Sequence, residues 1–137
     1  MSAPEFSGLV PGTRSYRRLI AGLFFAGVAT FAQLYSLQAL LPEMSTDLGV
    51  PPATAALSVS AATFGIAVAV VPWSMVADRI GRIPAMAIGI ITATAFGIAA
   101  PFSGGIEMVL ALRLAEGLAL GAVPAVALAY LSEEVHI

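Results

Sequence analysis

Four long stretches of the chain are apolar and almost free of charge, and they limit its possible folds more than any other feature. They cover residues 19–41, 55–77, 83–100 and 106–131. The first has 23 residues without a charge. As a helix it would be about 35 Å long, enough to cross a hydrocarbon core of about 30 Å, and it is too long for a signal peptide. The pattern predicts an all-α, polytopic membrane bundle of four transmembrane helices.

Composition supports a lipid environment and excludes several classes of function. The chain is 59% hydrophobic and 10% charged, whereas a soluble domain has about 25% charged residues. Its net charge is −2 and it has no lysine, which argues against a nucleic-acid partner. It has no cysteine and a single histidine, His136. Because no nucleophile–base pair or metal-ligand cluster is present, we expect neither an enzyme nor a bound metal or cofactor.

The distribution of basic residues predicts the topology. Five of the six arginines lie outside the apolar stretches: Arg14, Arg17, Arg18, Arg79 and Arg82. The connections at 43–54 and 101–105 contain no arginine or lysine. The positive-inside rule therefore places both ends of the chain and the 79–82 turn in the cytosol. Residues 1–18 are interpreted as a disordered cytosolic tail.

Glycines recur within the apolar stretches and indicate close helix packing. In lipid, small residues at helix contacts let the backbones approach one another. The candidates are Gly65, Gly89, Gly97, Gly117 and Gly121.

The turn between the second and third stretches resembles a signature of the major facilitator superfamily, Gly-x-x-x-Asp-Arg/Lys-x-Gly-Arg/Lys-Arg/Lys. Four of its positions match in identity and spacing: Asp78, Arg79, Gly81 and Arg82. Ser74 replaces the first glycine and Ile83 the last basic residue. The resemblance implies that Asp78 contacts the opposite half of a transporter and closes its cytosolic side. The alternative is a basic turn that only sets topology, with Asp78 capped by its neighbours.

The fourth stretch contains a second resemblance to this family, to its pattern Arg-x-x-Gln-Gly-x-Gly. Arg113, Glu116, Gly117 and Gly121 lie on one face of a helix, with Glu116 in the glutamine position. An arginine within the membrane costs at least about 2.5 kcal/mol, and a carboxylate one turn away offsets part of that. The resemblance implies that the arginine takes part in proton coupling. A purely structural Arg–Glu pair is the alternative.

Uncharged polar residues in the first stretch leave two interpretations open. Gln33, Tyr35 and Gln38 could line a cavity or donate hydrogen bonds to neighbouring helices. The ending at 130–136 is similar to the region after helix four in bacterial drug- and sugar-efflux members, which favours export.

The resemblance covers residues 19–137, whereas a complete family member has twelve helices in two halves. We therefore expect a partial N-terminal half that lacks helices five to twelve. In these four helices alone, the Arg113 face is expected to point at lipid or at another copy.

The expected function is part of a proton-coupled exporter of small organic molecules, such as drugs or sugars, in the bacterial cytoplasmic (inner) membrane. Its partners would be lipid and, in the full-length protein, substrate and protons. One alternative is a four-helix transporter of the small multidrug type acting as a dimer, although residues 19–41 lack the carboxylate that such proteins need. The other alternative is a non-transporting membrane subunit.

Overall fold

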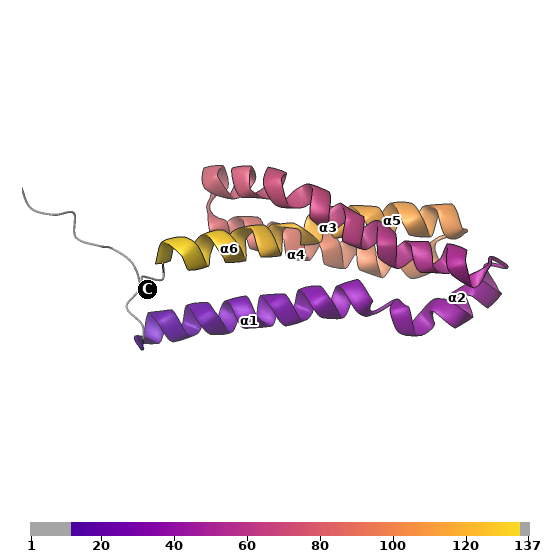
Figure 1. Ribbon diagram of the computed structural model, residues 1–137, viewed down its shortest axis with the longest axis horizontal. Coiled ribbons are helices and arrows are strands. Elements are labelled where there is room, and N and C mark those ends of the chain that lie inside the picture. Colours follow the sequence, from indigo (N-terminus) through magenta and orange to yellow (C-terminus); the bar gives the residue numbers. More distant parts are fainter. Residues whose placement is uncertain (1–11, 135–137) are drawn as a thin grey trace, which may run out of the picture.

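The computed structural model describes the backbone of residues 12–134 and the side chains of residues 12–130. Within these limits all regular structure is helical (Figure 1). The elements in chain order are α1 (Arg14–Tyr35), η1 (Gln38–Leu40), α2 (Leu41–Asp47), α3 (Pro52–Ile80), α4 (Arg82–Ala99), η2 (Ala100–Phe102), α5 (Ile106–Leu120) and α6 (Ala122–Glu134). They form four segments long and apolar enough to cross a membrane: Arg14–Asp47, Pro52–Ile80, Arg82–Phe102 and Ile106–Tyr130. The predicted all-α bundle with four spanning helices is confirmed.

Five of the six arginines lie at one end of the bundle. One end, on the left in Figure 1, holds the start of α1, the junction of α3 and α4, and the end of α6. The other end holds α2 and the start of α5. Arginines outside the apolar stretches therefore lie at the first end, and Glu43, Asp47 and Glu107 lie at the second.

The closest helix contact joins α3 to the fourth span, and glycines make it possible. A Cβ atom at Gly65 of α3 would lie 2.6 Å from the carbonyl oxygen of Leu114 on α5. A Cβ atom at Gly117 would overlap the backbone of Ala62. Only residues without a side chain allow the two backbones to approach this closely.

The fourth span is divided at Gly121, which separates α5 from α6. Gly121 packs against Ala69 of α3, and on α4 a Cβ atom at Gly89 would lie 2.5 Å from the Cβ of Ala122. Two clusters of buried residues lie one on each side of this division. One is Ala93, Ala119 and Leu120 with Ile66, and the other is Ala77, Ala85 and Val126 with Trp73, Met86 and Tyr130.

The helix bounds differ from the predicted stretches around the first span. Residues 1–11 of the expected tail lie outside the described residues. Helix α1 begins at Arg14, because the Thr13 side chain accepts a hydrogen bond from the Tyr16 N–H and caps the helix. It ends at Tyr35, before the predicted limit at residue 41.

The expected linker after the first span is partly helical. Helix α2 continues through Pro42 to Asp47, since Pro42 stands in its first turn, where a missing N–H is tolerated. The last residues of the ending at 130–136 lie outside the described residues.

The connection between α3 and α4 is shorter than the predicted turn. Asp78 and Arg79 belong to the last turn of α3, and Arg82 already begins α4. Gly81 makes the whole connection, with a φ of 96° that side chains rarely adopt. The motif glycine is therefore required by backbone geometry at this corner.

Candidate functional site

Two charged side chains of α5 are buried in the bundle and paired with each other. Arg113 and Glu116 each have 1% of their surface exposed. The Arg113 Nη1 atom lies 2.5 Å from the Glu116 Oε2 atom. The surrounding alanines and leucines favour helix formation, and a spacing of three residues brings the two side chains to one face.

Arg113 also holds the end of α1. Its Nη2 atom donates a 2.7 Å hydrogen bond to the carbonyl oxygen of Leu34, and Nη1 lies 3.4 Å from that of Gln33. Carbonyl groups in the last turn of a helix lack intrahelical partners, and the negative end of the helix dipole attracts a cation. The guanidinium therefore satisfies α1 and neutralises Glu116 at the same time.

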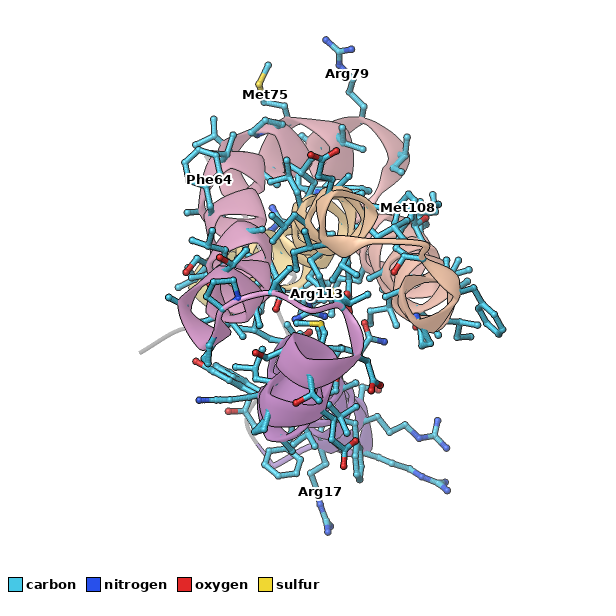
Figure 2. The ribbon with its side chains drawn as sticks, turned by 90° about the vertical axis from the view of Figure 1, so that its right-hand side faces the viewer. Arg17, Phe64, Met75, Arg79, Met108 and Arg113 are labelled. Atoms are coloured by element: carbon cyan, nitrogen blue, oxygen red, sulfur yellow. The ribbon has the colours of Figure 1, made fainter. Side chains whose placement is uncertain are left out.

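The expectation that the Arg113 face points at lipid or at another copy is wrong. Figure 2 shows Arg113 between α1 and the rest of the bundle. Helix α1 covers this face, because the guanidinium supplies the polar contact that docks the two helices.

Helix α4 also contributes to the cluster of polar residues around the Arg113–Glu116 pair. The Gln33 Nε2 atom donates a 2.7 Å hydrogen bond to Thr94 Oγ1, and Thr94 Oγ1 donates to the carbonyl oxygen of Ile90. A Cβ atom at Gly97 would lie 3.3 Å from Glu116 Oε1, so Gly97 leaves room for that carboxylate. The site thus joins α1, α4 and α5.

Two buried polar atoms of this cluster have no hydrogen-bond partner among the described residues. They are Gln33 Oε1, an acceptor, and Arg113 Nε, a donor. Buried polar groups are almost always satisfied by protein or by water. A buried water molecule or another polar group can use these atoms.

The three polar residues predicted in the first span lie in different environments. Gln33 joins the Arg113–Glu116 pair, whereas Tyr35 and Gln38 are exposed. Tyr35 stacks on Phe31 at a centroid distance of 6.2 Å. Sequence analysis missed Thr94, and it predicted Gly97 only as a packing residue, although the two lie one turn apart on α4.

The motif turn lies at the opposite end from α2. Ser74 is half-buried, and its Oγ donates to the Val71 carbonyl oxygen at 2.7 Å. Asp78 and Arg79 are exposed, and Arg79 projects away from the bundle (Figure 2). The Arg82 guanidinium lies 5.9 Å from the centre of the Tyr130 ring on α6, within cation–π range.

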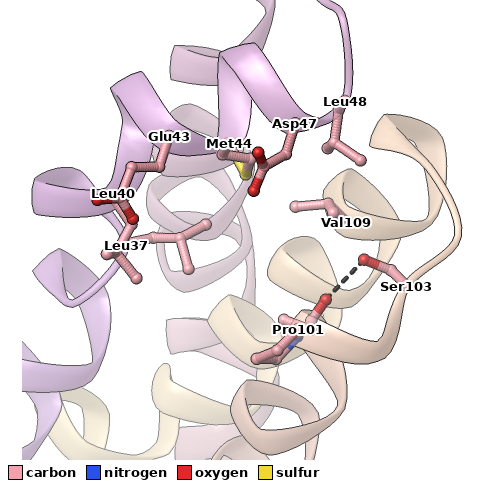
Figure 3. A pocket seen from close by; sticks show the side chains of 10 residues that line it. Leu37, Leu40, Glu43, Met44, Asp47, Leu48, Pro101, Ser103 and Val109 are labelled. Carbon is pink, nitrogen blue, oxygen red and sulfur yellow. Dashed lines mark hydrogen bonds between the residues drawn. The ribbon is translucent and has the colours of Figure 1, made fainter.

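A hollow at the α2 end is separate from this pair. Figure 3 shows it between α2 and the connection from α4 to α5, with a volume of about 300 Å³. Its lining combines apolar residues such as Leu37, Leu48 and Val109 with the carboxylates of Glu43 and Asp47. Within the described residues, no group of three or more His, Cys, Asp or Glu side chains could hold a metal ion.

Comparisons with known proteins match nearly the whole chain. The family model of the Major Facilitator Superfamily matches residues 23–135. The chain is 36% identical over 125 residues to "Uncharacterized MFS-type transporter YybF" of Bacillus subtilis (strain 168). It is also 36% identical over 125 residues to "Inner membrane transport protein YnfM" of Escherichia coli (strain K12). "Uncharacterized transporter BU588" of Buchnera aphidicola subsp. Acyrthosiphon pisum (strain APS) is 38% identical over 125 residues.

These alignments cover 90–91% of this chain but only 30–31% of each relative. The chain therefore spans less than a third of the length of the curated relatives it matches. The comparison with solved structures found no match. The family model matches both motif regions, most of the first span and all of the other three, so the resemblance is confirmed: the chain belongs to the major facilitator superfamily of membrane transporters.

Proposed function

We propose that the chain is the N-terminal part of a proton-coupled transporter that exports small organic molecules by alternating access. The buried Arg113–Glu116 pair is the observation that carries this proposal. Ionisable residues within membrane spans are costly and generally mark ion or substrate pathways. Residues 19–137 supply the first four helices of this transporter in our proposal.

The pair has the parts that proton coupling needs. A proton taken up by the Glu116 carboxylate removes the negative charge beside Arg113. The guanidinium then keeps its hydrogen bonds to the Gln33 and Leu34 carbonyl oxygens on α1, whereas its attraction to Glu116 on α5 becomes weaker. Gln33 Oε1 and Arg113 Nε provide free hydrogen-bonding capacity for water or substrate in the same cluster.

The motif turn is the proposed cytosolic gate. Asp78 is exposed on the last turn of α3, where the helix dipole disfavours an anion. A positive partner on the other half of the transporter would stabilise it. In our proposal, the geometry of this gate depends on four further residues at the α3–α4 junction: Ser74, Arg79, Gly81 and Arg82.

The proposed location is the bacterial cytoplasmic membrane, with both ends of the chain in the cytosol. The arginines outside the apolar stretches gather at one end of the bundle, and the other end has none, in the pattern of the positive-inside rule. The Escherichia coli relative is named an inner membrane transport protein, and the same membrane is proposed here.

A chimera tests the proposal directly. This chain replaces the matched N-terminal region of the Escherichia coli relative, and the chimera is reconstituted in vesicles that contain a pH-sensitive dye. Lipophilic cations and sugars are added in turn, and compound-dependent proton flux is measured. We expect flux with at least one compound, and its loss with Glu116→Gln or Asp78→Asn.

Glu107→Gln is the matched control, because Glu107 lies on the same helix as Glu116 but is exposed. It should keep the flux of the unsubstituted chimera. Unchanged flux in Glu116→Gln would reject the proton-coupling role of Glu116. Unchanged flux in Asp78→Asn would reject the gating role of the turn and leave it a role in membrane topology only.

A further inference from the structure

The fourth span is broken between α5 and α6, and the break lies between the buried ion pair and the motif turn. Helix α5 carries Arg113 and Glu116 on one side of it. On the other side, the Tyr130 ring of α6 lies 5.9 Å from the guanidinium of Arg82, the first residue of α4. The bend at the break therefore sets the position of α6 beside the motif turn.

Two backbone carbonyl groups leave the regular hydrogen-bond ladder at this break. In an unbroken α-helix, the Leu118 and Leu120 carbonyl oxygens would accept hydrogen bonds from the N–H groups of residues 122 and 124. Residue 124 is a proline, which has no N–H group. Helix α5 ends at Leu120, and carbonyl groups in the last turn of a helix need partners from outside it.

Trp73 of α3 supplies one of these partners. Its Nε1 atom donates a 2.7 Å hydrogen bond to the Leu118 carbonyl oxygen. Gly121 lets the two helices approach at this level, since a Cβ atom there would lie 2.7 Å from the Cβ of Ala69, one turn before Trp73. In membrane helices, backbone groups freed by proline or glycine are satisfied by neighbouring helices. At this break the neighbouring group is the Trp73 indole.

We infer that the fourth span switches between a bent and a straighter form, and that Trp73 is the positioning residue that holds the bent form. The Leu118 carbonyl has two alternative donors, the Trp73 indole N–H and the Ala122 N–H, which is its partner in an unbroken helix. Exchange between them leaves this oxygen paired in both forms, so the switch avoids the cost of an unpaired buried carbonyl. Packed elements with two such arrangements turn a small local change into the movement of a whole segment.

This switch concerns the movement of α6 and makes no use of a proton on Glu116. It therefore stands or fails separately from the proposed proton coupling.

Spin labels on either side of the break test the inference in the purified 137-residue chain, which has no cysteine of its own. Ile83→Cys/Leu128→Cys measures the distance from α4 to α6, and Ile98→Cys/Met108→Cys measures that from α4 to α5. All four side chains are more than half exposed. Because about 10 Å of helix separates Gly121 from Leu128, a change in bend of about 20° moves the α6 label by about 3 Å.

Two variants should favour the straighter form for different reasons. Trp73→Phe keeps an aromatic ring but removes the donor, and Pro124→Ala restores an N–H group for the Leu120 carbonyl. Both should shift the α4–α6 distance in the same direction by about 3 Å and leave the α4–α5 distance unchanged. Trp73→Phe is expected to lower stability and Pro124→Ala is not, because alanine favours an unbroken helix. A shift common to both variants would therefore not result from destabilisation.

The hydrogen bond itself can be followed, because Trp73 is the single tryptophan of the chain. Resonance Raman spectra should show a weaker hydrogen bond of the indole N–H in Pro124→Ala, since the Leu118 carbonyl then accepts from Ala122. Phe64→Leu, at an exposed side chain of the same helix as Trp73, is the control and should change neither the distances nor the indole band.

Three results would overturn the inference. The first is an unchanged α4–α6 distance and indole band in Pro124→Ala, which would mean that the bend is rigid. The second is a shift in opposite directions in Pro124→Ala and Trp73→Phe. The third is an equal change in the α4–α5 distance, which would mean that the whole bundle has loosened.

Discussion

The Arg113 Nη2 atom on α5 donates a 2.7 Å hydrogen bond to the Leu34 carbonyl oxygen, one residue before α1 ends. Helix α1 lies to one side of the other spans in Figure 1, and most of its surface is exposed. A charge-assisted hydrogen bond in this water-poor setting is stronger than a neutral one. This hydrogen bond makes the buried charge of Arg113 a structural link between α5 and α1.

Arg113→Ala is expected to release α1 from the bundle. The substitution removes the hydrogen bonds to α1 and leaves Glu116 buried without its partner, a change that costs about 3–5 kcal/mol in buried pairs. Thr30 of α1 is only 8% exposed, and the chain has no cysteine of its own. Maleimide labelling of Thr30→Cys should therefore be at least about tenfold faster when Arg113→Ala is present, since tenfold corresponds to only about 1.4 kcal/mol.

Glu116→Gln in the same Thr30→Cys background is the control for this experiment. It keeps the guanidinium and its two carbonyl partners on α1, so labelling should stay slow. Fast labelling in both variants would mean that the ion pair, rather than the contact to α1, keeps the helix docked.

Gly117→Ala is expected to destabilise the bundle, because the added Cβ atom would overlap the backbone of Ala62 and force α3 and α5 apart. Overpacking of this kind costs about 1–3 kcal/mol. Unfolding in a detergent titration, followed by the fluorescence of the single tryptophan Trp73, measures the change. Gly27→Ala is the matched control, since a Cβ atom there meets nothing within 4 Å. Equal stability of the two variants would contradict the close α3–α5 contact.

The sequence predicted the helices well because a bilayer requires long apolar segments and tolerates few charges within them. It predicted their ends less well. The first stretch was predicted to end at residue 41, but helix α2 continues past this point because Pro42, in its first turn, costs little. Helix α1 ends at Tyr35, next to the Leu34 carbonyl oxygen that accepts a hydrogen bond from Arg113, a tertiary contact that no local pattern reveals.

The candidate site, too, could be predicted from the sequence only in part. Arg113 and Glu116 could be found because charges within an apolar stretch are rare, and their spacing of three residues implies a pair. The choice of Gln33 over Tyr35 and Gln38 depends on which side of α1 meets α4. Thr94 and Gly97 look like ordinary packing residues until their contacts with Gln33 and Glu116 are known.

Trp73→Phe is expected to lower the free energy of unfolding by about 0.5–1.5 kcal/mol. The Trp73 Nε1 atom donates a 2.7 Å hydrogen bond to the carbonyl oxygen of Leu118, close to the division between α5 and α6. Phenylalanine keeps an aromatic ring but has no donor. Circular dichroism during a detergent titration gives the stability, because the variant has no tryptophan. Phe102→Leu, at a side chain that is 84% exposed, should have little effect. A similar loss in both variants would count against the hydrogen bond.

The proposed orientation can be tested with single cysteines at opposite ends of the bundle. Ile80 is the last residue of α3, beside the motif turn, and is 46% exposed. Leu48 follows the last residue of α2, at the end that holds Glu43 and Asp47. With both chain ends in the cytosol, a membrane-impermeant maleimide should label Leu48→Cys on intact cells but leave Ile80→Cys unmodified. Inverted membrane vesicles should give the opposite result.

The two positions control for each other, because the same reagent must reach one and spare the other in each preparation. Labelling of both cysteines after detergent is added shows that each thiol is reactive. If Ile80→Cys were instead labelled on intact cells and Leu48→Cys only in inverted vesicles, the arginine-rich end would face outward. The cytosolic gate proposed for Asp78 would then fail with the topology, whereas the buried contact of Arg113 with α1 would stand, since it does not depend on orientation.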